Sequence, residues 1–395
     1  MVALNNPLTW EQVAAFRLAR HHLSGGGLVK ALVSVVDDMT GAQAQLLSAA
    51  QISLRARVHD LEIAHIERAL DDRRLVKASA MRRTLFLLPA EDLAVYVRGT
   101  AGRADKGIGW ARGKSVPDGV IEAAIDAVLA ALDEPLTRPE IAERVSRTLK
   151  VPVQMVEGGG WGSARKHAAI PVGEITFPIW DLLHLAAARG VFCYGPPNGK
   201  EPTFVRADAW IPGWQDVPRE EAERLLLRRY LQAFGPATPE DFALWTGNSL
   251  RETRKLWARE EAGFAEVEIE GRQAHVLKED AAELQAAELP AARLEHVRLL
   301  PYFDVFLLGH KDRTHLVAGE HRGKVFRPQG WVAPVVLVDG RVAGVWKHDL
   351  KQGRLLVEVE KFGPMARTAA ARIREEAGDL ARFLGASGAD VRIGG

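Results

Sequence analysis

Cysteine is almost absent from this 395-residue chain, and its scarcity excludes several classes of protein. The single cysteine, Cys193, excludes an intramolecular disulfide and any cysteine-rich zinc or iron–sulfur site. No stretch of 18 apolar residues occurs, and the N-terminus lacks the basic and apolar regions of a signal peptide. We therefore expect a cytoplasmic protein that does not enter a membrane.

A strong charge of either sign is also missing. The 52 lysines and arginines nearly balance the 51 aspartates and glutamates, which leaves a formal net charge of +1. Any contact with nucleic acid must therefore depend on local clusters of basic residues. The catalytic motifs G-x-S-x-G and H-E-x-x-H, a nucleotide phosphate loop and a cysteine-histidine metal cluster are all absent. The sequence predicts neither a metal nor a cofactor.

Helix and turn signals repeat along the chain. The segment "PLTRPEIA" at 135–142 resembles "PATPEDFA" at 236–243, and each is accompanied by two further helical segments and a hairpin pattern. Three helices and a hairpin are typical of a winged helix-turn-helix. The predicted fold is α+β and mainly α, with winged helix-turn-helix domains at 1–115, 116–215 and 216–293 and a C-terminal β-rich domain with a terminal helix at 294–395.

The last hundred residues follow a different pattern from the repeats. Alternating apolar segments surround Asp339 and Gly340, a pair typical of a two-residue hairpin turn. Residues 367–385 are predicted as the last helix. Asp304 is the best-placed acidic residue of this part, and an ion pair that fixes the end of a strand is its expected role.

Basic side chains gather at several places that winged helices could present to DNA. A glycine-rich stretch at 157–171, "EGGGWGSARKHAAIP", is predicted as a long loop with an aromatic and several basic residues. Each cluster could equally be a solvated surface. The candidate DNA contacts are Arg82, Arg83, Trp161, Arg165, Lys166, His167, Arg313, Arg322 and Lys324.

Two glutamines, Gln43 and Gln45, stand one residue apart in "GAQAQLLSAAQISLRARV". On a strand they would point to the same side, whereas on a helix they would diverge. A glutamine is too weak a base to deprotonate water at neutral pH, but its amide can orient water. Orienting water is enough for hydrolysis only where the leaving group is good, as for a purine made cationic by N-alkylation. The alternative is a structural pair that caps a helix or is satisfied in the core.

Several segments resemble the AlkZ-like family of bacterial winged-helix DNA glycosylases. The resemblance rests on "LTWEQVAAFRLARHHL", "GAQAQLLSAAQISLRARV", "RRLVKASAMRRTLFLLPAEDL", "LLPYFDVFLLGHKDR" and "APVVLVDGRVAGVWK", and it covers nearly the whole chain. The family motif of Gln, a small or apolar residue, then Gln or Asp falls on Gln43, Ala44 and Gln45. The resemblance implies that this pair is catalytic and that tandem winged helices form a concave surface for DNA.

The resemblance also sets the expected function. It implies a metal-free, monofunctional DNA glycosylase of base excision repair, without a catalytic lysine. The implied substrate is double-stranded DNA with N7- or N3-alkylated purines or interstrand crosslinks. We expect a monomer associated with the nucleoid; the rival is a non-catalytic DNA-binding protein or transcriptional regulator. The chain departs from the family at "MRRTLF", where Arg83 replaces a glycine and Phe86 a histidine. This departure concerns substrate preference most directly.

Overall fold

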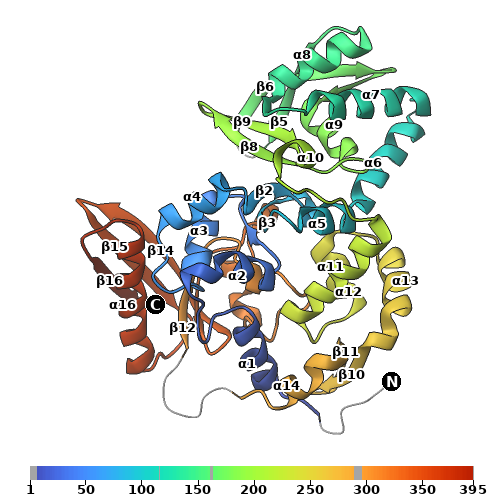
Figure 1. The fold of residues 1–395 in the computed structure, drawn as a ribbon. Coiled ribbons are helices and arrows are strands. Elements are labelled where there is room, and N and C mark those ends of the chain that lie inside the picture. Colours follow the sequence, from blue (N-terminus) through green and yellow to red (C-terminus); the bar gives the residue numbers. More distant parts are fainter. Residues whose placement is uncertain (1–6, 115, 161–162, 289–295, 395) are drawn as a thin grey trace.

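Helices and a small sheet build the N-terminal part of the chain. The computed structural model describes residues 7–114, 116–160, 163–288 and 296–394 (Figure 1). A capping box starts the first helix, because Thr9 and Gln12 each accept a hydrogen bond from the other's backbone N–H. The elements are α1 (Trp10–Arg20), α2 (Leu32–Asp38), β1 (Ala42–Gln43), α3 (Leu47–Arg55), α4 (Ile63–Asp71), β2 (Leu75–Ser79), β3 (Leu85–Pro89) and α5 (Leu93–Gly99), with sheet order β1-β3-β2.

The second part of the chain stands apart at the top of Figure 1 and has a core of its own. That core draws on residues between Ile108 and Phe204. Thr137 and Glu140 form the capping box that the "PLTRPEIA" pattern predicts. The elements are α6 (Gly102–Gly113), α7 (Asp118–Ala131), β4 (Leu136–Thr137), α8 (Arg138–Leu149), β5 (Gln154–Gly160), β6 (Ser163–Val172), β7 (Ile175–Pro178), α9 (Ile179–Ala186), β8 (Phe192–Asn198), β9 (Glu201–Arg206) and α10 (Ala207–Trp210).

The glycine-rich stretch at 157–171 is a correction to the sequence prediction. It is not a long loop: β5 and β6 pair as antiparallel strands, and β7 extends them to a three-stranded sheet. Strand pairing uses backbone N–H and C=O groups, which glycine supplies as well as any other residue. The sequence therefore showed no alternation of side chains that would have predicted these strands. Trp161, the aromatic candidate for DNA contact, lies outside the described residues.

The third part repeats the order of three helices and a hairpin. Thr238 and Asp241 form a capping box, with Pro239 at the first helical position. Both Glu270 and Gly271 have positive φ, at 46° and 85°, and they form the turn between the two strands of the hairpin. The elements are α11 (Arg219–Phe234), α12 (Pro239–Thr246), α13 (Leu250–Glu260), β10 (Phe264–Ile269), β11 (Arg272–Leu277) and α14 (Ala281–Gln285).

A five-stranded sheet dominates the C-terminal part, in the order β12-β13-β14-β15-β16. Asp339 and Gly340 form the predicted two-residue turn, both with positive φ. The last predicted helix is present but is not terminal, because a strand follows it and pairs in parallel with β15. Along that strand, half-buried positions alternate with exposed ones. The elements are β12 (Val297–Leu300), α15 (Arg322–Val325), β13 (Val335–Val338), β14 (Arg341–Lys351), β15 (Arg354–Lys361), α16 (Arg367–Phe383) and β16 (Ala389–Gly394).

The part of the chain that the structure describes is a mixed α and β protein. One continuous core joins the first, third and C-terminal parts, and Val191, Cys193 and Val205 of the second part also belong to it. Within the residues described, no helix is long and apolar enough to cross a membrane. The second part therefore has a core largely of its own, whereas the other three parts depend on one another for burial.

A fully buried ion pair connects two of these parts. The Arg57 guanidinium donates to both carboxylate oxygens of Asp304, at 2.7 and 2.9 Å, and neither side chain is exposed. Ser53 of α3 donates to the same carboxylate at 2.7 Å. The expectation that Asp304 forms an ion pair is confirmed. This pair holds the segment after α3 against the segment after β12.

We expect Asp304→Ala to lower the free energy of unfolding by about 3–5 kcal/mol, because it leaves the buried Arg57 charge without a partner. Denaturant unfolding followed by circular dichroism measures this loss. The matched control is Glu360→Ala, which breaks the exposed pair with Lys324. Water screens that pair, so its loss should cost far less. Equal losses in the two variants would contradict the importance of the buried pair.

Candidate functional site

Gln43 and Gln45 lie where a strand passes into a helix. Gln43 ends β1, opposite Phe86 of β3, and α3 begins at Leu47. Ala44 between them is fully buried, and its N–H donates to the carbonyl of Leu85 at 2.6 Å. The extended backbone therefore continues to residue 44, and alternation along it directs both glutamines away from the face that buries Ala44.

The hydrogen-bond partners of Gln43 and Gln45 show which end of each side-chain amide, the oxygen or the nitrogen, meets the protein. Arg82 donates from Nη2 to Oε1 of Gln43 at 3.2 Å, and the backbone N–H of Leu85 is 3.4 Å from Oε1 of Gln45. Both partners can only donate, so the atom that meets them must be the carbonyl oxygen. Each glutamine keeps a second lone pair and two amide N–H groups for other ligands. Gln43 is 7% exposed, whereas Gln45 is partly exposed.

Arg82, predicted to contact DNA, is half-buried and donates a hydrogen bond to Gln43. Its second donor, Nη1, reaches the carbonyl of Trp245 at 2.6 Å, near the end of α12. One guanidinium therefore spans the first and third parts of the chain beside the glutamine pair. Its backbone is left-handed, with φ of 57°, which costs an arginine about 1 kcal/mol relative to the ordinary helical region.

The two departures from the family pattern have different structural consequences. Arg83 also has a positive φ, 62°, so an arginine occupies a backbone conformation that glycine adopts without strain. Its Nη2 lies 3.6 Å from Asp181 of α9, so the side chain reaches across to the second part. Phe86 is fully buried on β3 and belongs to the main core. The first departure changes the surface beside the glutamines, and the second changes the packing beneath them.

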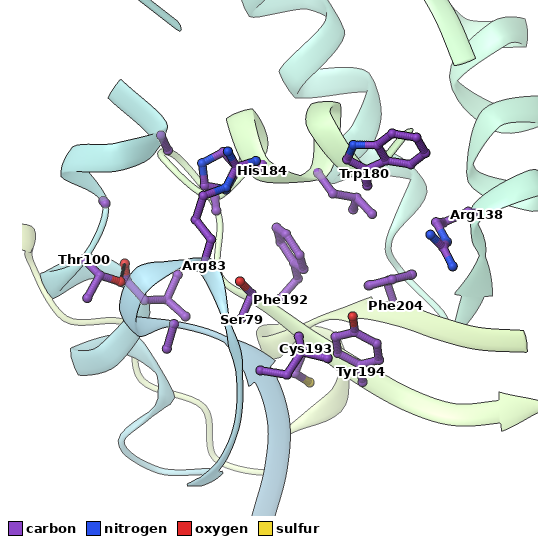
Figure 2. Close-up of a pocket in the computed structure, with 17 residues that line it drawn as sticks. Ser79, Arg83, Thr100, Arg138, Trp180, His184, Phe192, Cys193, Tyr194 and Phe204 are labelled. Carbon is purple, nitrogen blue, oxygen red and sulfur yellow. Dashed lines mark hydrogen bonds between the residues drawn. The ribbon is translucent and has the colours of Figure 1, made fainter. Parts of the chain in front are cut away.

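A cavity of about 260 Å³ lies between the first and second parts (Figure 2). In Figure 2 Arg83 reaches from the loop before β3 toward α9, which carries Trp180 and His184. Burial raises the pKa of Asp181, and the Arg83 guanidinium partly offsets that rise. The other aromatic walls come from β8 and β9: Phe192, Tyr194 and Phe204.

The basic residues of the β5–β6 hairpin lie beyond this cavity. Lys166 is exposed on β6, and the ring of His167 meets that of Trp180 edge to face, with centroids 4.4 Å apart. The backbone of Arg165 pairs with Gly158 in the same hairpin. His167 thus supports a wall of the cavity, whereas Lys166 is available to solvent.

The C-terminal candidates lie in another part of the fold, between β12 and β13. Arg313 donates from Nε to the carbonyl of His310 and lies over Phe326, 4.4 Å from its centroid. Burial, assisted by the charge of Arg322, lowers the pKa of Arg313 to about 10. Lys324 pairs with Glu360 at 2.6 Å. These contacts give Arg313 a packing role, while Arg322 and Lys324 remain exposed.

Three features of the site gave no signal in the sequence. They are the carbonyl of Trp245, the N–H of Leu85 and the carboxylate of Asp181, of which two are backbone groups that any residue supplies. Across the ranges that the structure describes, no group of three or more His, Cys, Asp or Glu side chains could hold a metal ion. The recognisable chemistry near Gln43 and Gln45 is therefore that of amides and guanidinium groups.

Comparison with known proteins agrees with this description. The family model described as "DNA glycosylase AlkZ-like" matches residues 36–383. An interstrand DNA cross-link repair glycosylase from Streptomyces sahachiroi is 34% identical over 397 residues, which cover 98% of this chain and 99% of that protein. The solved structure of the Streptomyces sahachiroi DNA glycosylase AlkZ has a TM-score of 0.80 at 31% identity, covering 98% of this chain and all of that one. The resemblance seen in the sequence is confirmed: this chain belongs to the AlkZ-like family of DNA glycosylases.

Proposed function

We propose that this protein is a monofunctional DNA glycosylase that hydrolyses the N-glycosidic bond of N7- and N3-alkylated purines in double-stranded DNA. The observation that carries the proposal is the paired orientation of Gln43 and Gln45, each with its carbonyl oxygen bound by a donor-only partner. Unhooking of interstrand crosslinks is part of the proposal, because a relative of similar length is named for that repair.

The chemistry needs little more than an oriented water molecule. Alkylation makes the purine cationic, so it takes the glycosidic electron pair and leaves as a neutral base. Positive charge then develops at C1′, where the water oxygen bonds; the extra proton passes to solvent. Gln43 and Gln45 would position that water through their remaining lone pairs and N–H groups. The product is an abasic site with an intact strand.

The guanidinium of Arg82 cannot assist the reaction by its charge. A cation beside a forming oxocarbenium ion raises the energy of that ion. Arg82 contributes instead by orienting Gln43, whose amide would otherwise rotate, and by joining it to Trp245 of α12. We therefore assign Arg82 as a positioning residue.

The DNA surface is a further part of the proposal. We propose that the helix-and-hairpin units at 1–115, 116–215 and 216–293 act as winged helix-turn-helix modules around the glutamine pair. Exposed Lys166, Arg322 and Lys324 would bind phosphates, with little preference for sequence. The protein would act as a monomer on DNA in the cytoplasm.

Gln43→Ala and Gln45→Ala should each lower the rate of base release about a hundredfold or more, because each removes one preorganised polar contact. Release of free alkylpurine from methylated duplex DNA, measured by mass spectrometry, gives the rate. DNA affinity should barely change, and Gln51→Ala on α3 is the matched control. Alanine variants that excise at the wild-type rate but melt several degrees lower would make the pair structural. A wild-type protein that binds DNA but releases no base would be the rival regulator.

Gln45→Asp should retain measurable activity, because a carboxylate can accept from water and face a cationic sugar. The variant's rate should fall in acid as the carboxylate is protonated, near the ordinary aspartate pKa of about 4. The wild type has no titrating group at this position, so its rate should not show this fall in acid. A pH profile of single-turnover base release tests this, and identical profiles for the two proteins would contradict the role of residue 45.

Arg82→Ala should lower the single-turnover rate about tenfold, the scale of one lost charge-assisted hydrogen bond, with nearly unchanged DNA affinity. Arg82→Lys should recover part of the rate, because an ammonium can still reach one of the two oxygens. Lys166→Ala is the comparison: it should weaken DNA binding and reduce the salt dependence of log K by about one unit. The same change in salt dependence for Arg82→Ala would restore its predicted role in binding phosphate.

A further inference from the structure

The cavity between the first and second parts combines aromatic walls with positive charge. Trp180, Phe192, Tyr194 and Phe204 supply the rings, and its volume of about 260 Å³ is close to the lower end of the range for small-ligand pockets, roughly 300 to 1,000 Å³. A flat group the size of one nucleobase suits this space and these walls, because base–aromatic stacking is favourable for every base.

The cavity adjoins the glutamine pair through the chain segment that holds it. Leu85 lines the cavity, and its N–H faces Gln45. Arg83 also lines the cavity, and its neighbour Arg82 binds Gln43. Both Arg83 and Asp181 have somewhat under half of their side chains exposed, so the cavity opens to solvent at this end. A ligand at this opening would lie next to the site proposed for the reaction.

The two arginines that line the cavity differ in whether a carboxylate neutralises their charge. Arg83 faces Asp181, whereas no ion pair joins Arg138 to a carboxylate among the residues described. Arg138 is half-buried, and it acts on Tyr194, where burial raises the pKa of the phenol and the guanidinium opposes the rise. A half-buried guanidinium without a carboxylate is suited to an anionic group such as a phosphate.

We propose that this cavity binds an unstacked nucleotide of the DNA, with its base between the aromatic rings and its phosphate at Arg138. The inference rests on the proposed function, since it assumes that DNA lies across the Gln43 and Gln45 site. Stacking and phosphate binding are separate contributions here, so each can be removed without the other.

The charge of the cavity also selects which nucleotide enters. An N-alkylated purine is cationic, and the net positive charge of the lining opposes it. An ordinary base is neutral and meets no such opposition. We therefore assign the cavity to the nucleotide on the opposite strand, which loses its partner when the damaged base is displaced, and not to the damaged nucleotide itself.

Photo-crosslinking of the full-length protein tests this assignment. One duplex carries a tetrahydrofuran abasic analogue with 5-iododeoxyuridine opposite it; the other carries 5-iododeoxyuridine in the damaged strand at the same position, opposite adenine. We expect the first duplex to crosslink to a peptide containing Trp180, Phe192 or Tyr194, and the second to leave these peptides unmodified. Crosslinking of these peptides by the second duplex alone would overturn the assignment to the opposite strand.

Variants separate the two contributions and control for folding. Trp180→Ala and Arg138→Gln should each lower the yield of this crosslink about tenfold, the scale of one lost stack or one lost phosphate contact. Arg147→Gln is the matched control, because it removes the charge of an exposed arginine on the same helix, α8. Equal yields for Arg138→Gln and Arg147→Gln, or a crosslink confined to other peptides, would overturn the proposal.

The result also distinguishes this inference from the proposed function. Release of alkylpurine without a crosslink in the cavity would remove the nucleotide site and leave the glycosylase proposal intact. A crosslink in the cavity without any release of base would retain the nucleotide site and remove the glycosylase proposal.

Discussion

The buried pair of Arg57 and Asp304 is the constraint on which the position of the glutamines depends. Two charges without access to water are stable only as a closely bonded pair, and here the bidentate contact and Ser53 satisfy the carboxylate. Ser53 belongs to α3, the helix that starts just after Gln45. Arg55 of the same helix pairs with Glu376 of α16 at 3.0 Å, so the C-terminal part holds α3 at two points. The conformation around residues 43–45 is thus supported by side chains about 260 and 330 positions later in the chain.

Arg82 extends this dependence to the third part of the chain. Its guanidinium links Gln43 to Trp245, and the strained backbone at residues 82 and 83 places these two arginines on different partners. Strain of this kind persists only where surrounding contacts compensate for it. The partners of Arg82 lie in the first and third parts of the chain. Arg83 instead reaches to Asp181 in the second part. Adjacent residues with the same side chain therefore have different roles, which their types alone could not distinguish.

The cavity beside the site lies where the second part, with a core largely of its own, meets the first part. Three parts of the chain share one core, which Cys193 of β8 and Val205 of β9 also join. The second part has most of its core to itself, and it meets the rest of the protein near α5 and α6 (Figure 1). At that junction, aromatic residues from α9, β8 and β9 line the cavity together with Arg83 (Figure 2). A glycosylase must hold distorted DNA as well as position water, and the proposed nucleotide site assigns these two tasks to neighbouring surfaces.

The sequence by itself determined the features that depend on a few neighbouring residues. These include the capping boxes at Thr137 and Thr238, the turn at Asp339 and Gly340, the ionic character of Asp304 and the spacing of Gln43 and Gln45. Only the tertiary structure decided that 157–171 is largely a hairpin, that a strand follows α16, and that Arg82 binds Gln43 rather than lying free on the surface. Each of these depends on a partner that the residue types do not specify: the opposite strand of a glycine-rich hairpin, the edge of β15, or the amide of Gln43, which is 39 positions away.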